Sequence, residues 1–268
     1  MKRTLLLAAL CAGLTSAMAQ FPGDKPSAPT GPPADPAKSI QKLDGTRFKL
    51  GTLEFDQKTR EVFIPAKVNM REGLLEYVLV HESGKVHESL FSTPVKPMEL
   101  NVVLLLLNWK ESKAFFDFSQ PDRGGVPVKN AKNPPESLVE IHVAWKDKDG
   151  QEQTCRLENW LHQVEKKAKL TEEPWIYTGS MISADGVFQA EENGSILALY
   201  VDATALLNNP RDGNELDDVW INDPAVPEKG TPVTVIFKPA AAAAKKAGPE
   251  KPATKQTAPL NKKPTAKP

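Results

Sequence analysis

Two of the chain's four histidines lie six residues apart in the segment VHESGKVHES, which spans Val80 to Ser89. Each of them, His81 and His87, is followed by glutamate and serine. Imidazole, carboxylate and hydroxyl groups bind metal ions, transfer protons or act as nucleophiles. The repeat therefore predicts a ligand-binding site made of His81, His87, Glu88 and Ser89, provided that the backbone brings these side chains to one face.

The single glycine of the segment, Gly84, predicts a β-hairpin whose register decides whether the histidines can act together. A two-residue turn at 83–84 places His81 and His87 on opposite faces of the sheet. A three-residue loop at 82–84 places both on one face as diagonal neighbours. The second register fits the sequence better, because a three-residue hairpin loop favours glycine at its last position.

In that second register Glu88 falls on the other face of the hairpin, among valines and a leucine. A carboxylate on an apolar face is costly unless it is paired or protonated. Glu88 is therefore either a site carboxylate, one member of a structural ion pair, or a residue at an edge that water reaches. The sequence leaves these alternatives open.

The remaining motifs give little support to metal binding or catalysis. Two histidines need a third and usually a fourth ligand, and neither His142 nor His162 has the spacing of a metal motif. Lys85 would repel a cation, and the segment around Ser180 lacks the second glycine of a nucleophile elbow. The acidic stretch 211–224 departs from the spacing of a calcium loop. We therefore expect no metal and no cofactor, and the sequence identifies no catalytic residue.

The elements that would position this site lie between two terminal segments of unusual amino-acid composition. Residues 1–19 have a basic start, an apolar run and the small-residue end Ala17-Met18-Ala19, which is the order of a secretory signal peptide. The apolar run is too short to span a bilayer. A lipid anchor at Cys11 is disfavoured because Leu10 stands where a small residue is expected. We therefore expect an exported protein, periplasmic or extracellular.

Two further segments have the composition of disordered chain. Residues 20–38 are rich in proline, and residues 239–268 contain six prolines, seven lysines and one glutamate. The whole chain has a formal net charge of zero, of which the signal contributes +2 and the tail +6, so that −8 remains on residues 39–238. An acidic body does not favour nucleic acid as a partner, whereas the cationic tail suits an anionic polymer or membrane surface.

Residues 39–238 are long enough for one domain with its own core. Leu100, Val103, Leu104 and Leu107 have the spacing of one helix face. The turn DKDG predicts a hairpin over 137–157. Other strands are expected at 48–53, 61–68, 74–81, 86–91, 175–182, 186–190, 195–201 and 232–237, and a short helix at 203–207. This order predicts an α+β fold: a mostly antiparallel sheet built from hairpins with a few short helices, as a single domain with disordered tails.

Several runs of the sequence resemble the YdjY domain family of exported bacterial proteins. They are VNMREGLLEYVLVHESGKVHESLF, WIYTGSMI, GVFQAEENGSILALY, DATALLNNP and DDVWIND, and the most specific is the K-x-H-E-S-L run from Lys85 to Leu90. The resemblance covers residues 51–237 and implies export and a shared fold rather than a particular reaction. Some members are described as ferredoxin-associated, but after signal cleavage only Cys155 remains, which excludes a four-cysteine cluster and predicts a buried, inert thiol.

Two functions are compatible with these observations. The first is an exported, non-enzymatic accessory or binding domain that recognises an envelope protein or a small ligand, with the tail tethering it to an anionic surface. The alternative is an enzyme or metal-assisted protein that uses His87, Glu88 and Ser89. A Glu88 buried beside a histidine in a concave pocket would favour the second function, and a solvated Glu88 would favour the first.

Overall fold

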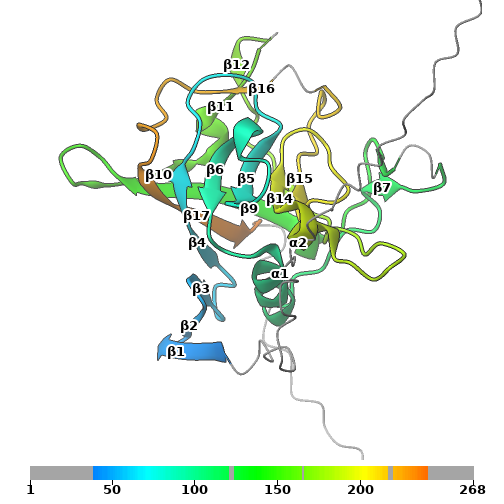
Figure 1. Cartoon of the computed structure of the whole chain (residues 1–268), viewed down its shortest axis with the longest axis horizontal. Helices are drawn as coiled ribbons and strands as arrows, with labels where there is room; N and C mark the ends of the chain where they lie inside the picture. The colour runs from blue at the N-terminus through cyan, green and yellow to red at the C-terminus, as the bar shows by residue number, and fades with distance from the viewer. Residues whose placement is uncertain (1–38, 121–123, 165, 217–219, 241–268) are drawn as a thin grey trace, which may run out of the picture. The chain divides into compact units, whose positions relative to one another are not determined.

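The computed structural model describes residues 39–120, 124–164, 166–216 and 220–240 (Figure 1). The expected signal peptide, the proline-rich linker and the expected tail from residue 241 onward lie outside these ranges. Within the described ranges, no helix combines the length and the hydropathy that a membrane span requires.

Strands make up most of the regular secondary structure of the described chain, and helices are few. The strands are β1 (Ile40–Asp44), β2 (Arg47–Leu50), β3 (Leu53–Asp56), β4 (Val62–Val68), β5 (Tyr77–His81), β6 (Ser89–Thr93), β7 (Phe116–Asp117), β8 (Val126–Pro127), β9 (Leu138–Lys146), β10 (Glu152–Arg156), β11 (Leu161–Gln163), β12 (Ala168–Lys169), β13 (Trp175–Tyr177), β14 (Ser195–Ala198), β15 (Leu207–Asn208), β16 (Trp220–Asn222) and β17 (Pro232–Pro239). The helices are α1 (Pro97–Leu106), α2 (Gln189–Asn193) and the short 3₁₀ turns η2 (Val86–Glu88), η4 (Pro135–Ser137) and η5 (Leu157–Trp160). A mostly antiparallel sheet with few short helices is thereby confirmed.

Eight strands of the main sheet form a closed ring. Their order is β4, β17, β9, β13, β15, β14, β5 and β6, and β6 pairs back with β4 (Figure 1). One edge of β4 serves two partners, because Val62 and Phe63 pair with β3 while Lys67 and Val68 pair with β6. The sheet therefore closes into a barrel, which the local pattern of hairpins does not predict and which removes most of its free edges.

The core follows from the strand period of two. In β4 the buried residues Val62, Ile64 and Val68 share one hydrophobic cluster with residues of β9 and β17, while their strand neighbours are partly exposed. Val139, Ile141 and Val143 alternate in the same way along β9. Strands β4 and β9 thus contribute alternate side chains to this cluster, whereas β5, β6, β13 and β14 bury side chains on both faces.

The predicted helix face is confirmed in α1. Pro97 begins the helix, where its missing N–H is not needed. Leu100, Val103 and Leu104 are fully buried, and Leu107, just after the helix, is nearly so. The predicted hairpin of β9 and β10 is also confirmed, and the Asp147 N–H donates to the carbonyl of Gln151 at 2.9 Å across its turn.

The predicted hairpin of residues 74–91 is wrong. β5 and β6 run parallel, with Tyr77 opposite Ser89 and His81 opposite Thr93. The connection from residue 82 to residue 88 therefore runs back along the length of β5. Strand β14, not β6, is the antiparallel neighbour of β5.

Two glycines make this arrangement possible. The His81 N–H donates to the carbonyl of Gly194 at 2.8 Å, which brings the connection against the turn before β14. A Cβ atom at Gly84 would lie 2.9 Å from the Asn193 carbonyl oxygen, and one at Gly194 would lie 2.8 Å from the Gly84 Cα atom. Gly84 is therefore required for close backbone approach and not for a left-handed hairpin loop.

Two smaller expectations are also wrong. No strand forms at 186–190, where only an isolated bridge at Phe188 precedes α2, and the expected helix at 203–207 is a turn that leads into β15. The Asp202 carboxylate bonds to the Thr204 backbone N–H at 2.7 Å, and side-chain bonds of this kind compete with helix formation.

Candidate functional site

The four residues of the predicted site do not converge. Because β5 and β6 are parallel, His81 lies at the end of β5 whereas His87 lies just before the start of β6. The end of β5 and the start of β6 are four residues apart along the strand direction, which corresponds to about 13 Å. His81 bonds to the Ser83 hydroxyl at 2.7 Å, and the Ser89 hydroxyl is buried and donates to the Phe91 carbonyl at 2.8 Å. A site shared by both histidines therefore has no geometric basis, and Ser89 cannot reach a substrate.

Glu88 instead belongs to a polar cluster with Tyr77. Its side chain is 20% exposed and lies 4.0 Å from the Lys85 ammonium and 3.6 Å from the imidazole of His87. The Lys85 ammonium donates to the Tyr77 hydroxyl at 2.6 Å, and this hydroxyl donates to the Asp202 carboxylate at 2.8 Å. Desolvation raises the pKa of Tyr77, and the negative charge of Asp202 raises it further. Of the readings open for Glu88, the structural ion pair fits this geometry.

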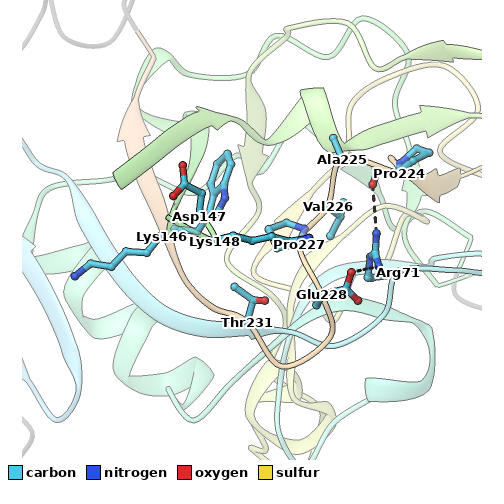
Figure 2. A pocket seen from close by; sticks show the side chains of 11 residues that line it. Arg71, Lys146, Asp147, Lys148, Pro224, Ala225, Val226, Pro227, Glu228 and Thr231 are labelled. Atoms are coloured by element: carbon cyan, nitrogen blue, oxygen red, sulfur yellow. Dashed lines mark hydrogen bonds and ion pairs between the residues drawn. The ribbon is translucent and has the colours of Figure 1, made fainter. Parts of the chain in front are cut away.

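A pocket of about 440 Å³, here called the Trp145 pocket, lies between the β9–β10 turn and the loop that leads into β17. Its walls include Trp145, Lys148, Pro224, Val226 and Pro227, and Arg71 and Asp147 lie at opposite sides (Figure 2). The indole ring of Trp145 packs against Trp160 with ring centroids 4.8 Å apart. The pocket thus has an aromatic and proline-rich wall that is anchored on the core.

The charged groups around the Trp145 pocket differ in how they are paired. The Arg71 guanidinium contacts the Glu228 carboxylate at 2.8 Å and the Pro224 carbonyl at 3.4 Å (Figure 2). Bonds from Gln151 and other groups of the β9–β10 turn lower the pKa of the Asp147 carboxyl. Lys148 is exposed and makes no ion pair with any residue in the described ranges. With Lys146, three cations and two carboxylates line the pocket, so the net charge of its lining is positive.

Asp223 fixes the wall of the pocket formed by residues 224–226. One carboxylate oxygen accepts the N–H of Ala225 at 2.7 Å, and the other bonds to the imidazole of His162. Desolvation raises the pKa of Asp223, but the bonds from Ala225 and His162 and the charge of Lys169 outweigh it, so the pKa lies below its ordinary value. The carboxylate is therefore ionised at neutral pH and keeps this wall in place.

A second pocket, of about 870 Å³, opens between the loop 127–133 and the segment 210–215. Its floor contains Arg211, whose side chain is 5% exposed and contacts the fully buried Glu158 carboxylate at 3.0 Å. Arg211 also lies over the ring of Trp175 at 4.8 Å. Both lysines and carboxylates line this pocket, so it has no clear preference of charge.

The buried pair of Glu158 and Arg211 was not predicted from the sequence. The two residues are separated by 53 positions, and no motif connects them. The available signal was weak: Glu158 stands in the largely apolar run LENWL, where a carboxylate needs a partner. The sequence does not name that partner, because the pairing depends on the tertiary fold.

Comparison with known proteins gives one positive result. The YdjY domain matches residues 53–238, which is close to the extent of the resemblance seen in the sequence. No curated protein and no solved structure matches the chain. Since the match covers more than half of the sequence and nearly all of the described residues, the chain belongs to the YdjY domain family.

Proposed function

We propose that this protein is an exported, non-enzymatic binding domain of the bacterial envelope, and that the Trp145 pocket is its ligand site. The observation that carries the proposal is the pairing of a partly exposed indole wall with a lysine that has no ion-pair partner among the described residues. An indole face and proline rings favour a flat or apolar group, and an ammonium favours a negative charge. The ligand class is therefore a small organic anion with an aromatic or apolar group.

The internal contacts that hold Arg71 and Asp147 support a binding role. Both groups are held by hydrogen bonds or ion pairs within the protein, so they shape the pocket without having to reorganise when a ligand enters. Lys148 can then contact the ligand's negative group while the indole of Trp145 covers its apolar part. This arrangement binds and orients a ligand and requires no bond to be broken.

Ligand-observed NMR can test the proposal with paired probes. Aromatic carboxylates and the corresponding neutral amides are titrated into the full-length protein. We expect the carboxylates to bind more tightly than the amides, and Lys148→Glu to reverse this preference. Lys42→Glu, which makes the same charge change on the exposed face of β1, is the matched control and should leave the preference unchanged. Equal binding of carboxylates and amides, or an equal effect of both variants, would contradict the proposed ligand class.

The proposal also includes export by the N-terminal signal and tethering by the cationic tail. The seven lysines and single glutamate of residues 239–268 support attraction to an anionic surface. Sedimentation with vesicles that contain anionic lipid should capture the full chain and not a chain that ends at Ala240. Capture of both chains to the same extent would show that the tail is not the tether. Fractionation of cells should find the protein outside the cytoplasm only when residues 1–19 are present.

A further inference from the structure

Strand β10 has a free edge. It pairs with β9 and with no other strand of the described chain. Figure 1 shows the β9–β10 hairpin projecting from the barrel, so the edge is accessible. The strand contains no proline, its pairing with β9 is regular, and Glu152 and Thr154 are exposed. Free edges of this kind are templates for pairing with another strand.

The register of the hairpin shows which backbone groups point outward. The Asp147 N–H bonds to the Gln151 carbonyl across the turn. Hydrogen-bonded and non-hydrogen-bonded pairs alternate along an antiparallel ladder, so Gln153 and Cys155 direct their backbone groups at β9. The N–H and carbonyl groups of Glu152, Thr154 and Arg156 therefore point away from the barrel, toward the free edge.

The sequence of this edge, EQTCR, is complementary to itself in charge. If two copies pair antiparallel about Thr154, Glu152 of each copy lies opposite Arg156 of the other, and Thr154 lies opposite Thr154. These are the residues whose backbone groups point outward, so each of these opposed pairs can form its backbone hydrogen bonds. Lys146 lies opposite Glu152 within the hairpin, so each Glu152 would lie between two cations.

We propose that two copies of this chain associate through their β10 strands in this antiparallel register. The association continues the sheet across a two-fold axis at Thr154, as an isologous interface requires. The paired segment is short, about 17 Å long. Because a contact of this size is small, we expect a weak dimer whose population depends on protein concentration. This inference is independent of the ligand proposed for the Trp145 pocket.

Disulfide trapping tests the register directly. In full chains with Cys11→Ser and Cys155→Ser, Thr154→Cys places two thiols on the axis, with Cα atoms about 5.5 Å apart, within the range of about 4.4–6.8 Å that a disulfide spans. The matched control Glu152→Cys places its two thiols about 14 Å apart. Mild oxidation should convert Thr154→Cys to a covalent dimer and leave Glu152→Cys monomeric. A monomeric Thr154→Cys, or equal crosslinking of both variants, would overturn the register.

Charge reversal tests the interface without a new thiol. Glu152→Arg brings like charges together at both ends of the paired segment and should weaken dimerisation by about tenfold in sedimentation experiments. Asp149→Arg makes the same change of charge in the exposed turn, outside the paired segment, and should not weaken it. Equal melting temperatures of the two variants would show that both remain folded. An unchanged association constant for Glu152→Arg, or a wild-type protein that stays monomeric at high concentration, would overturn the proposal.

Discussion

Replacement of Glu158 by glutamine should strongly destabilise the protein. The Glu158 carboxylate is fully buried and contacts Arg211 at 3.0 Å and Arg156 at 3.2 Å, and it accepts the indole N–H of Trp175 at 3.0 Å. Desolvation lowers the pKa of Arg211 and attraction to Glu158 offsets this only in part, which leaves the pKa at about 10, so Arg211 is charged at neutral pH. The glutamine variant therefore leaves a buried cation without its counter-charge.

The expected magnitude follows from the other bonds of Arg211. Removal of one partner from a buried ion pair costs about 3–5 kcal/mol. Arg211 keeps bonds to the Asn209 side chain and to the carbonyls of Thr171 and Glu173, which favours the lower end of that range. A loss of about 3 kcal/mol should lower the melting temperature of a domain of this size by about 6–12 °C.

Urea denaturation of a double-mutant cycle can measure this effect. Glu158→Gln and Arg211→Met should each be strongly destabilising, and the double variant Glu158→Gln/Arg211→Met should lose much less than the sum of the single changes. The reason is that the double variant removes both charges of the pair, so neither is left unpaired in the core. A loss below about 1 kcal/mol for Glu158→Gln, or an additive double variant, would refute the role assigned to this pair.

Three further predictions concern other positions. Because the folded-state pKa of Asp223 is lowered, its contribution to stability is present above about pH 4 and is lost as the pH falls through the folded-state pKa. Between pH 6 and pH 3 the melting temperature of Asp223→Asn should therefore fall less steeply than that of the wild type. Parallel curves would contradict the role of the bond between Asp223 and His162. Gly84→Ala should lower the free energy of unfolding in chemical denaturation by about 1–3 kcal/mol, because its Cβ would lie 2.9 Å from the Asn193 carbonyl oxygen. An unchanged free energy of unfolding would show that the backbone can move apart at this contact. Burial raises the pKa of the Cys155 thiol to about 11, so its alkylation by iodoacetamide at pH 8 should be about 200-fold slower than in urea, and equal rates would show a reactive thiol.

Local patterns of the sequence predicted the elements whose partners are close along the chain. The leucine spacing of α1 and the DKDG turn of the β9–β10 hairpin each depend on neighbouring residues, and both are confirmed. The segment around Gly84 was misread because a glycine between two alternating runs is compatible with a hairpin and with a parallel return. The deciding contact is with Gly194, more than a hundred residues away.

The candidate site shows the same limit. The sequence left the role of Glu88 open, and the apolar face assigned to it depended on a hairpin that does not form; in the structure the Lys85 ammonium lies 4.0 Å from the Glu88 carboxylate. It did not predict that Asp202 lies beside Tyr77, nor that loop residues near Pro227 form a pocket with Trp145. Each of these neighbours comes from a distant segment, and which segments meet is set by the closure of the barrel.

The position of β17 in the ring also determines when the domain can finish folding. This last strand lies between β4 and β9, and it pairs with both along most of its length. A nascent chain that ends before Pro232 leaves those two strands without their shared neighbour, so the ring is open until nearly the whole domain has been synthesised. The barrel therefore cannot close progressively from the N-terminus, and a partner that engages a chain lacking β17 would find unpaired backbone on β4 and β9.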